Sequence, residues 1–134
     1  MVNLDTNTAL AFIAEGSPVR YQLREYVQGK QMVITQTAFD EFTCIVQRSG
    51  GVLEQERTSR FLQILTITSD NPSARALSLR PTRRLEENDI IILGTGDQLG
   101  IVTMTADVNA VRSALAQGVD FNVYIHSPFS LTGN

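Results

Sequence analysis

Short apolar, β-branched segments alternate with longer helical patterns along this chain, and this alternation limits the folds open to it. The strand-like segments cover residues 2–5, 31–35, 64–68, 101–105 and 123–125. Apolar residues at helical spacing fill most of the intervals between them. A strand–helix–strand order predicts a parallel sheet, because parallel strands need a long crossover connection. The expected fold class is therefore α/β, with helices on both faces of a parallel sheet and a polar tail after residue 125.

Capping residues predict where the helices begin and end. Gly16 closes a helix over residues 6–15, and Ser17 is an expected N-cap with Pro18 at the first position of the next helix. Thr35 or Thr37 is expected to cap a third helix, whose apolar side carries Phe39, Phe42, Ile45 and Val46. Further helices are predicted over residues 53–63, 74–79 and 108–117.

The size of the chain predicts one domain. It has 134 residues, and neither a repeat nor a Pro/Ser-rich linker divides it. An apolar share of 43% and a charged share of 19% are typical of a globular protein with its own core. We therefore expect residues 1–134 to form a single domain.

Features of targeting and redox chemistry predict a cytoplasmic protein. The longest apolar runs fall far short of the roughly 20 residues that span a bilayer, and the first residues do not resemble a signal peptide. Cys44 is the only cysteine, so no internal disulfide forms, and its place on an apolar helix favours a packed thiol over a nucleophile. With His126 the only histidine, a histidine triad or zinc site is not expected.

The charge of the chain does not predict binding to nucleic acid by simple electrostatic attraction. The formal net charge is −3, whereas nucleic-acid-binding domains are usually basic. Ten of the eleven basic residues are arginines, whose planar guanidinium suits phosphate. For the cluster of Arg80, Arg83 and Arg84, contact with RNA phosphate and a solvated loop are equally good interpretations.

Acidic residues follow two of the predicted strands. Asp5 comes at the end of the first strand, and Asp107 comes two residues after the fourth. In open α/β sheets, ligands bind outside the carboxyl ends of the strands. We therefore expect the functional site at the edge of the sheet where the strands end.

Four segments together carry a resemblance to a known family: Leu4-Asp5-Thr6-Asn7-Thr8, Ala38-Phe39-Asp40-Glu41-Phe42, Asn88-Asp89-Ile90-Ile91-Ile92 and Thr103-Met104-Thr105-Ala106-Asp107. Their acids and order resemble the PIN-domain pattern over about residues 2–126. The resemblance implies a three-layer α/β/α sandwich with a central five-stranded parallel sheet, so that residues 1–134 form a single PIN-like domain. It also implies an endoribonuclease that hydrolyses RNA with Mg²⁺ or Mn²⁺. Many members of this length are VapC-like toxins paired with a small antitoxin, and single-domain members often form homodimers.

The resemblance assigns roles to the four main acids. Asp5, Asp89 and Asp107 are expected to bind the cation directly or through water, and Glu41 to orient the attacking water or lie in the outer shell. Clustered carboxylates repel one another unless a cation is shared among them, and Mg²⁺ prefers oxygen ligands. Each acid also has a structural interpretation. Asp5 and Asp107 fit helix N-caps, Asp89 fits a first-turn acid, and Glu41 fits a solvated position for which Asp40 is the rival acid.

Neighbouring residues support or depart from the family pattern. Thr105 is expected to hold Asp107 or a water on the metal, and Asn7 to fix the loop around Asp5. Ala106 and Asn109 replace an asparagine and an aspartate of many members, and Asp97 is an extra acid that is more simply explained as a surface residue.

Residues 86–100 are the ambiguous segment. The run from Ile90 to Leu93 has strand propensity, yet Asn88 is a good N-cap and Gly94-Thr95-Gly96 breaks any alternation. Chiefly from the resemblance, we expect a buried helix, with Gly94 and Gly96 where the family usually has alanine.

Two other classes of function fit less well. A receiver-like domain needs an adjacent acid pair after the first strand and a late lysine, but the only lysine is Lys30. No P-loop motif is present. The alternative within the family is a catalytically weak PIN scaffold that binds RNA or a protein partner.

Overall fold

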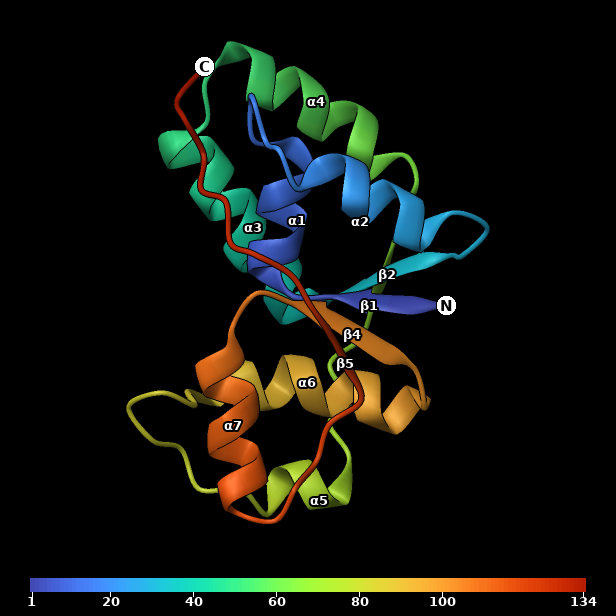
Figure 1. Cartoon of the computed structure of the whole chain (residues 1–134), viewed down its shortest axis with the longest axis vertical. Coiled ribbons are helices and arrows are strands. Elements are labelled where there is room, and N and C mark those ends of the chain that lie inside the picture. Colours follow the sequence, from blue (N-terminus) through green and yellow to red (C-terminus); the bar gives the residue numbers. More distant parts are fainter.

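Five short parallel strands form one sheet in the computed structural model, which describes residues 1–134 (Figure 1). The strand order is β3-β2-β1-β4-β5, so β1 is central. Val2 of β1 pairs with Met32 of β2, and Leu4 pairs with Met104 of β4. The strands are β1 (Val2–Leu4), β2 (Met32–Thr35), β3 (Leu65–Thr68), β4 (Val102–Thr105) and β5 (Val123–Ile125).

Helices cover both faces of this sheet. Figure 1 shows α1 to α4 on one side of the strands and α5 to α7 on the other. This arrangement confirms the predicted α/β/α sandwich with a five-stranded parallel sheet. No helix is both long and apolar enough to span a membrane. The helices are α1 (Thr6–Ile13), α2 (Arg20–Val27), α3 (Gln36–Ser49), α4 (Val52–Leu62), α5 (Ala74–Leu77), α6 (Glu87–Leu99) and α7 (Val108–Ala116).

Two groups of buried side chains lie on either side of the sheet. The larger centres on α1, α3 and the middle strands, with Leu4, Ile13 and Phe42 fully buried. The smaller joins α5, α6 and α7 through Leu85, Leu93 and neighbouring residues. Burial of these apolar side chains on both faces fixes the sheet between the helices, and with it the edge where the strands end.

The ambiguous segment is a buried helix, α6, as predicted. Its start differs from the prediction: the helix begins at Glu87 with Glu86 as the N-cap, and Asn88 lies in the first turn. The carboxylate of Asp89, the third residue of the helix, reaches back and accepts a hydrogen bond from the N–H of the N-cap Glu86 at 2.9 Å. Gly100 ends α6 in the left-handed conformation.

Two local predictions were wrong. The second helix begins at Arg20 rather than at Pro18, with Val19 at the N-cap position and no side-chain capping bond. The Arg20 guanidinium donates to the carbonyls of Phe12 and Ala14 and ties the start of α2 to the end of α1. The Ser17 hydroxyl is buried without a partner and caps nothing.

Cys44 is exposed rather than packed. It follows the buried Phe42 by two residues, which places it on nearly the opposite side of α3.

The predicted polar tail after β5 packs against the domain. It runs from β5 past α1 and α3 to the start of α4 (Figure 1). Phe129 and Leu131 pack on the larger core. The buried carboxylate of Glu54 accepts hydrogen bonds from the backbone N–H groups of Thr132 and Gly133, both at 2.9 Å. These contacts hold the segment along α3 and α4.

Candidate active site

Asp5 lies at the carboxyl end of the central strand, and both of its carboxylate oxygens are hydrogen-bonded. Oδ1 accepts from the Thr6 N–H at 2.7 Å and caps α1. Oδ2 accepts from the Thr105 hydroxyl at 2.7 Å. The side chain is 7% exposed. The capping interpretation is therefore correct for Asp5, and the same carboxylate faces the ends of both β1 and β4.

Thr105 and Asn7 join the two strand ends. The Thr105 hydroxyl that donates to Asp5 also accepts the Asp107 N–H at 3.0 Å. The Asn7 side-chain oxygen accepts the Ala106 N–H at 3.0 Å. Because Asn7 follows β1 and Ala106 follows β4, these bonds fix the loop that carries Asp5 against the loop that carries Asp107.

Glu41 reaches this edge from α3, and its carboxylate is held at both oxygens. Oε1 accepts from the Thr6 hydroxyl at 2.7 Å, and Oε2 accepts from the Asn88 amide at 3.1 Å. The neighbouring Asp40 is exposed, and its carboxylate accepts a hydrogen bond only from the Gln36 side-chain amide. Thr6 and Asn88 were missed as site residues in the sequence analysis. Thr6 lies inside the Asp5-Thr6-Asn7 motif, but Asn88 carried only a capping signal.

Asp107 and Asp89 each use one carboxylate oxygen to start a helix. Asp107 Oδ1 accepts the Ala110 N–H at 3.0 Å and caps α7. Asp89 Oδ2 accepts the Glu86 N–H at the start of α6. The other oxygen of each carboxylate makes no hydrogen bond within the protein, so each acid keeps an oxygen for a ligand or water.

The acids raise one another's proton affinity. Burial raises the pKa of Asp5 to about 6, against the hydrogen bonds from Thr105 and Thr6, and the charges of Asp89 and Asp107 add to the rise. Burial also raises the pKa of Asp89 to about 6, and the charges of Asp107, Glu86 and Glu41 contribute. The two ion pairs of the chain, Arg57–Glu15 and Arg75–Asp97, involve none of the four predicted acids. The site therefore carries negative charge without a cationic side chain in direct contact.

The oxygen atoms here match the chemistry of a hard divalent cation, which binds carboxylates and retains several waters. No three His, Cys, Asp or Glu side chains lie close enough to share one metal ion directly. A cation bound at this edge would therefore need water among its ligands, in keeping with the carboxylate oxygens of Asp89 and Asp107 that remain free.

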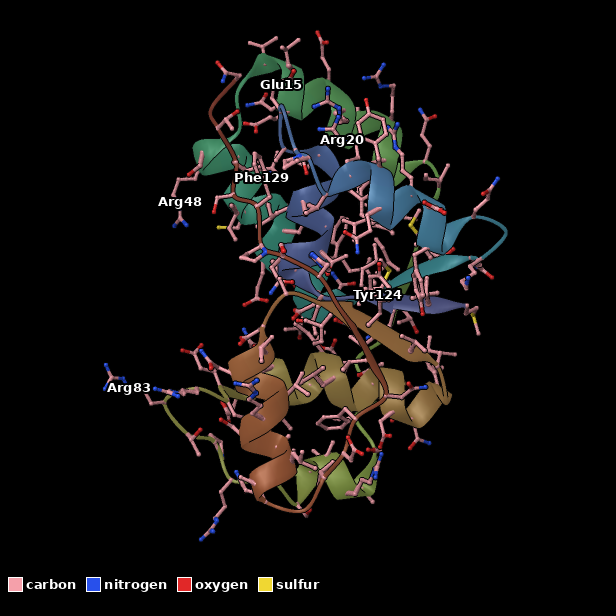
Figure 2. The ribbon with its side chains drawn as sticks, in the orientation of Figure 1. Glu15, Arg20, Arg48, Arg83, Tyr124 and Phe129 are labelled. Atoms are coloured by element: carbon pink, nitrogen blue, oxygen red, sulfur yellow. The ribbon has the colours of Figure 1, made fainter.

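A polar groove of about 320 Å³ opens beside Asp89 and Asp107. Arg83, Arg84 and Asn109 also line it, so two of the three predicted arginines lie at the acids. Figure 2 shows Arg83 on the loop that precedes α6, beside α7. Arg80 does not line the groove: its backbone N–H and carbonyl bond to the Gln117 side chain, both at 2.9 Å.

Asp97 and His126 have structural partners. Asp97 pairs with Arg75 at 2.7 Å and accepts from the Ser73 hydroxyl at 2.6 Å, and its side chain is only 16% exposed, so it is a partly buried, paired acid rather than a solvated surface residue. His126 is buried, with its ring nitrogens near the Thr8 hydroxyl at 2.7 Å and the Ser127 carbonyl at 2.9 Å. Burial lowers the pKa of His126.

Comparison of the chain with protein families gives one match that spans nearly all of it. Residues 8–134 match the family described as "Protein of unknown function (DUF1308)". The chain belongs to the DUF1308 family.

Solved structures resemble this DUF1308 member over almost its whole length. VapBC2 from Rickettsia felis, bound to a DNA fragment from the promoter, is 17% identical with a TM-score of 0.65, covering 96% of this chain and 100% of that one. VapC20 from Mycobacterium tuberculosis, a sarcin-ricin loop cleaving toxin, is 15% identical with a TM-score of 0.59, covering 91% and 99%. A domain of a functionally unknown protein from Methanocaldococcus jannaschii is 16% identical with a TM-score of 0.58, covering 96% and 92%.

These likenesses confirm the predicted fold. The DUF1308 chain has a VapC-like PIN-domain fold. At such low identity the likeness concerns the fold alone, and the chemistry has to be argued from the residues of this chain.

Proposed function

We propose that this protein is a metal-dependent endoribonuclease that hydrolyses RNA phosphodiester bonds. The observation that carries the proposal is the buried carboxylate of Asp5, whose pKa is raised to about 6 by burial and by the charges of Asp89 and Asp107. Such a perturbed group at the carboxyl edge of an open α/β sheet is characteristic of functional sites. A bound Mg²⁺ or Mn²⁺ would supply positive charge for the transition state and lower the pKa of a water that it binds.

Each acid has a proposed part in this chemistry. Asp5, Asp89 and Asp107 hold the cation, directly or through water. Glu41 orients the attacking water, because Thr6 and Asn88 fix both of its carboxylate oxygens. Thr105 and Asn7 are supporting residues that keep the loops of Asp5 and Asp107 together.

The proposed RNA contact lies in the groove beside Asp89. Arg83 and Arg84 line this groove together with the acids, so a phosphate bound by either guanidinium would lie next to the metal ligands. Arg80 lies outside this groove, so the proposed contact consists of Arg83 and Arg84.

The likeness to VapC proteins supports a more specific proposal. The chain acts as the toxin of a toxin–antitoxin pair, with a small antitoxin protein as its partner. We further propose that residues 1–134 work as a single PIN-like domain, that the protein acts in the cytoplasm, and that it forms a homodimer.

A second candidate is a catalytically weak PIN scaffold that binds RNA or a protein partner. The observation that favours it is the spacing of the acids, since no three of them lie close enough to share one ion directly. Ala106 and Asn109, at positions where the PIN-domain pattern often has an asparagine and an aspartate, also favour it.

Cleavage of a structured RNA with Mn²⁺, Mg²⁺ or EDTA distinguishes the two candidates. We expect cutting with either metal and none with EDTA, and a loss of at least 100-fold in Asp5→Asn and Glu41→Gln. Asp40→Asn is the matched control, because Asp40 is exposed and lies outside the site. If the wild-type protein binds the RNA but does not cut it under any condition, the scaffold is correct. If Asp5→Asn cuts as fast as the wild type, the proposed site is wrong.

A further inference from the structure

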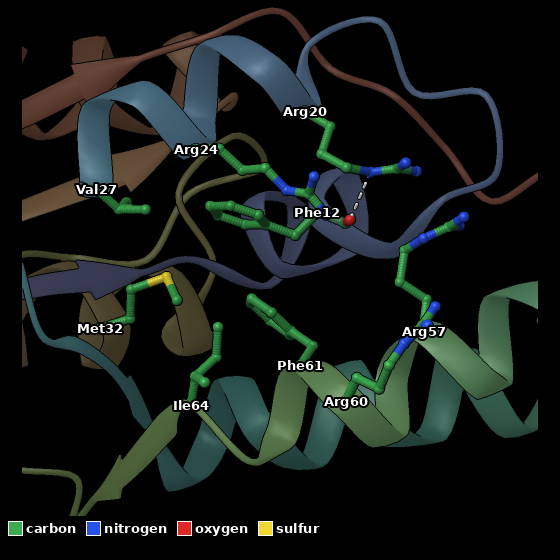
Figure 3. A pocket seen from close by; sticks show the side chains of 9 residues that line it. All are labelled: Phe12, Arg20, Arg24, Val27, Met32, Arg57, Arg60, Phe61 and Ile64. Carbon is green, nitrogen blue, oxygen red and sulfur yellow. Dashed lines mark hydrogen bonds between the residues drawn. The ribbon is translucent and has the colours of Figure 1, made fainter.

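Four of the ten arginines gather at a pocket remote from the acids. The pocket has a volume of about 490 Å³ and lies between α2 and α4 over the last turn of α1 (Figure 3). Asp5 caps the first turn of α1, and Phe12 of the pocket follows seven residues later, roughly 10 Å along the helix. Its lining residues are Phe12, Arg20, Arg24, Val27, Met32, Arg57, Arg60, Phe61 and Ile64.

The pocket has an apolar part and a cationic part. In Figure 3, Val27, Met32 and Ile64 lie toward one end and Arg20, Arg57 and Arg60 toward the other, while Arg24 extends from α2 past Phe12. Phe12 and Phe61 lie between, with their rings stacked at 5.1 Å between centroids. A ligand that fills both parts needs an apolar or aromatic body with an anionic group at one end.

Two of the guanidiniums have partners. Arg57 pairs with Glu15 at 2.8 Å and donates to the Ile13 carbonyl at 3.0 Å. Arg20 donates to two backbone carbonyls, those of Phe12 and Ala14. Burial lowers the pKa of Arg20, and the charges of Arg57 and Arg24 lower it further. Positive charges at this pocket therefore repel one another.

The other two guanidiniums, of Arg24 and Arg60, form no ion pair and no side-chain hydrogen bond. They come from different helices, α2 and α4, and line the same pocket. Glu15 is the only carboxylate paired with any of the four arginines. The pocket thus retains unneutralised positive charge, and guanidinium N–H donors of Arg24 and Arg60 are available to a ligand. Both features favour an anion that carries more than one charge.

We propose that this pocket binds a nucleoside phosphate, with the phosphate between Arg24 and Arg60 and the base against Phe61 and Ile64. A phosphate monoester is close to a dianion at neutral pH and accepts paired hydrogen bonds from arginine forks. A single carboxylate would leave one of the two free guanidiniums without a partner. Planar bases stack on aromatic rings and on guanidinium faces, which this pocket supplies together. The volume lies in the range of small-molecule sites.

This inference does not depend on the proposed nuclease, because none of the lining residues belongs to the acidic edge. The same chemical group occurs in a free mononucleotide and at the 5′-phosphorylated end of an RNA strand. Both sources present a phosphate monoester on a nucleoside, so the experiment has one arm for each.

The test is isothermal titration calorimetry in EDTA, which removes metal-dependent binding and cleavage. The probes are adenosine 5′-monophosphate, adenosine, inorganic phosphate and a short 5′-phosphorylated single-stranded RNA with its 5′-hydroxyl counterpart. The test variant is Arg24→Gln with Arg60→Gln, both exposed positions whose change breaks no internal contact. Arg48→Gln is the matched control, since Arg48 is an exposed arginine on the side of α3 away from α2 (Figure 2).

We expect the mononucleotide or the 5′-phosphorylated RNA to bind at least tenfold more tightly than adenosine, inorganic phosphate or the 5′-hydroxyl strand. The double variant should lose at least tenfold in affinity, and Arg48→Gln should bind like the wild type. If the 5′-phosphorylated RNA binds and the mononucleotide does not, the pocket is a site for the 5′-phosphorylated ends of RNA strands. Equal binding of inorganic phosphate and mononucleotide, unchanged binding in the double variant, or no binding of either phosphorylated probe would overturn the proposal.

Discussion

At the scale of single residues, Asp5 lowers the stability of the fold that positions it. Its pKa is about 6 in the folded protein and 3.8 for an ordinary aspartate. Between these values the folded state binds more protons than the unfolded state, so the free energy of unfolding falls as pH rises through this range. Above about pH 6 the loss in the free energy of unfolding is complete. A shift of about two pKa units corresponds to a loss of roughly 3 kcal/mol at most.

Asp5→Asn should therefore increase stability while it removes activity. Asparagine keeps an oxygen for the Thr6 N–H but carries no charge into the buried site. We expect the free energy of unfolding at pH 7.5 to rise by about 1–3 kcal/mol, and its fall between pH 4.5 and pH 7 to become shallower. Urea denaturation at several pH values measures both quantities. An unchanged pH slope in the variant would show that Asp5 does not carry the shift. Asp40→Asn, at an exposed acid, is the control.

Glu54 is a buried acid with the opposite effect on stability. Its carboxylate accepts backbone N–H groups from three separate segments, at Glu15, at Gly51, and at Thr132 and Gly133. Burial tends to raise the pKa of Glu54, but these hydrogen bonds lower it below the ordinary value.

Glu54→Ala would leave four N–H groups unpaired, so we expect a loss of about 4 kcal/mol or more in the free energy of unfolding. Glu56→Ala, at an exposed site on the same helix, should change it by less than about 0.5 kcal/mol. Chemical denaturation compares the two. A small effect of Glu54→Ala would mean that the segment after β5 contributes little to stability.

At the scale of helices and strands, local patterns located most elements but not their contacts. The five strands follow from runs of β-branched residues, and α6 was expected to be helical chiefly because of the family resemblance. Its true cap, Glu86, was missed because Asn88 carried the stronger local signal. The contact between Asn88 and Glu41 joins residues 47 positions apart, and no local pattern encodes such a distance. The fixing of residues 132–133 by Glu54 was missed for the same reason.

The glycines of α6 have a packing reason. A Cβ at Gly96 would lie 3.0 Å from the Asn3 amide nitrogen and closer still to the Thr103 hydroxyl, so α6 can approach β1 and β4 only without a side chain here. Gly96→Ala should lower the free energy of unfolding by about 1–3 kcal/mol, although alanine favours helix by about 1 kcal/mol. Gln98→Ala, exposed on the same helix, should not lower it. Thermal or urea denaturation measures the difference in the free energy of unfolding between each variant and the wild type. If Gly96→Ala stabilised the protein, α6 would be free to move away from β1 and β4.

At the scale of the whole molecule, the candidate site draws on both layers of helices. Asp5 and Glu41 come from the side of α1 and α3, whereas Asp89 and Asp107 begin α6 and α7 on the other side. The two buried groups of side chains lie behind these pairs of acids. Repulsion among the acids therefore acts between the two layers, and a shared cation would act as an attraction between them.

Divalent cations should consequently stabilise the folded protein as a whole. A ligand that binds only the folded state adds RT ln(1 + [L]/Kd), or about 1.4 kcal/mol at ten times Kd. We expect Mn²⁺ to raise the unfolding midpoint of the wild-type protein at pH 7.5 in a concentration-dependent way. Asp5→Asn and Asp89→Asn, at the starts of helices that cover opposite faces of the sheet, should each remove most of that rise, and Asp40→Asn should retain it. Differential scanning calorimetry with Mn²⁺ or EDTA measures the effect. If only one of the two site variants lost the response, the cation would be held by the acids of one helix layer alone. If neither did, the bound cation would lie elsewhere, and the proposed metal ligands would be wrong.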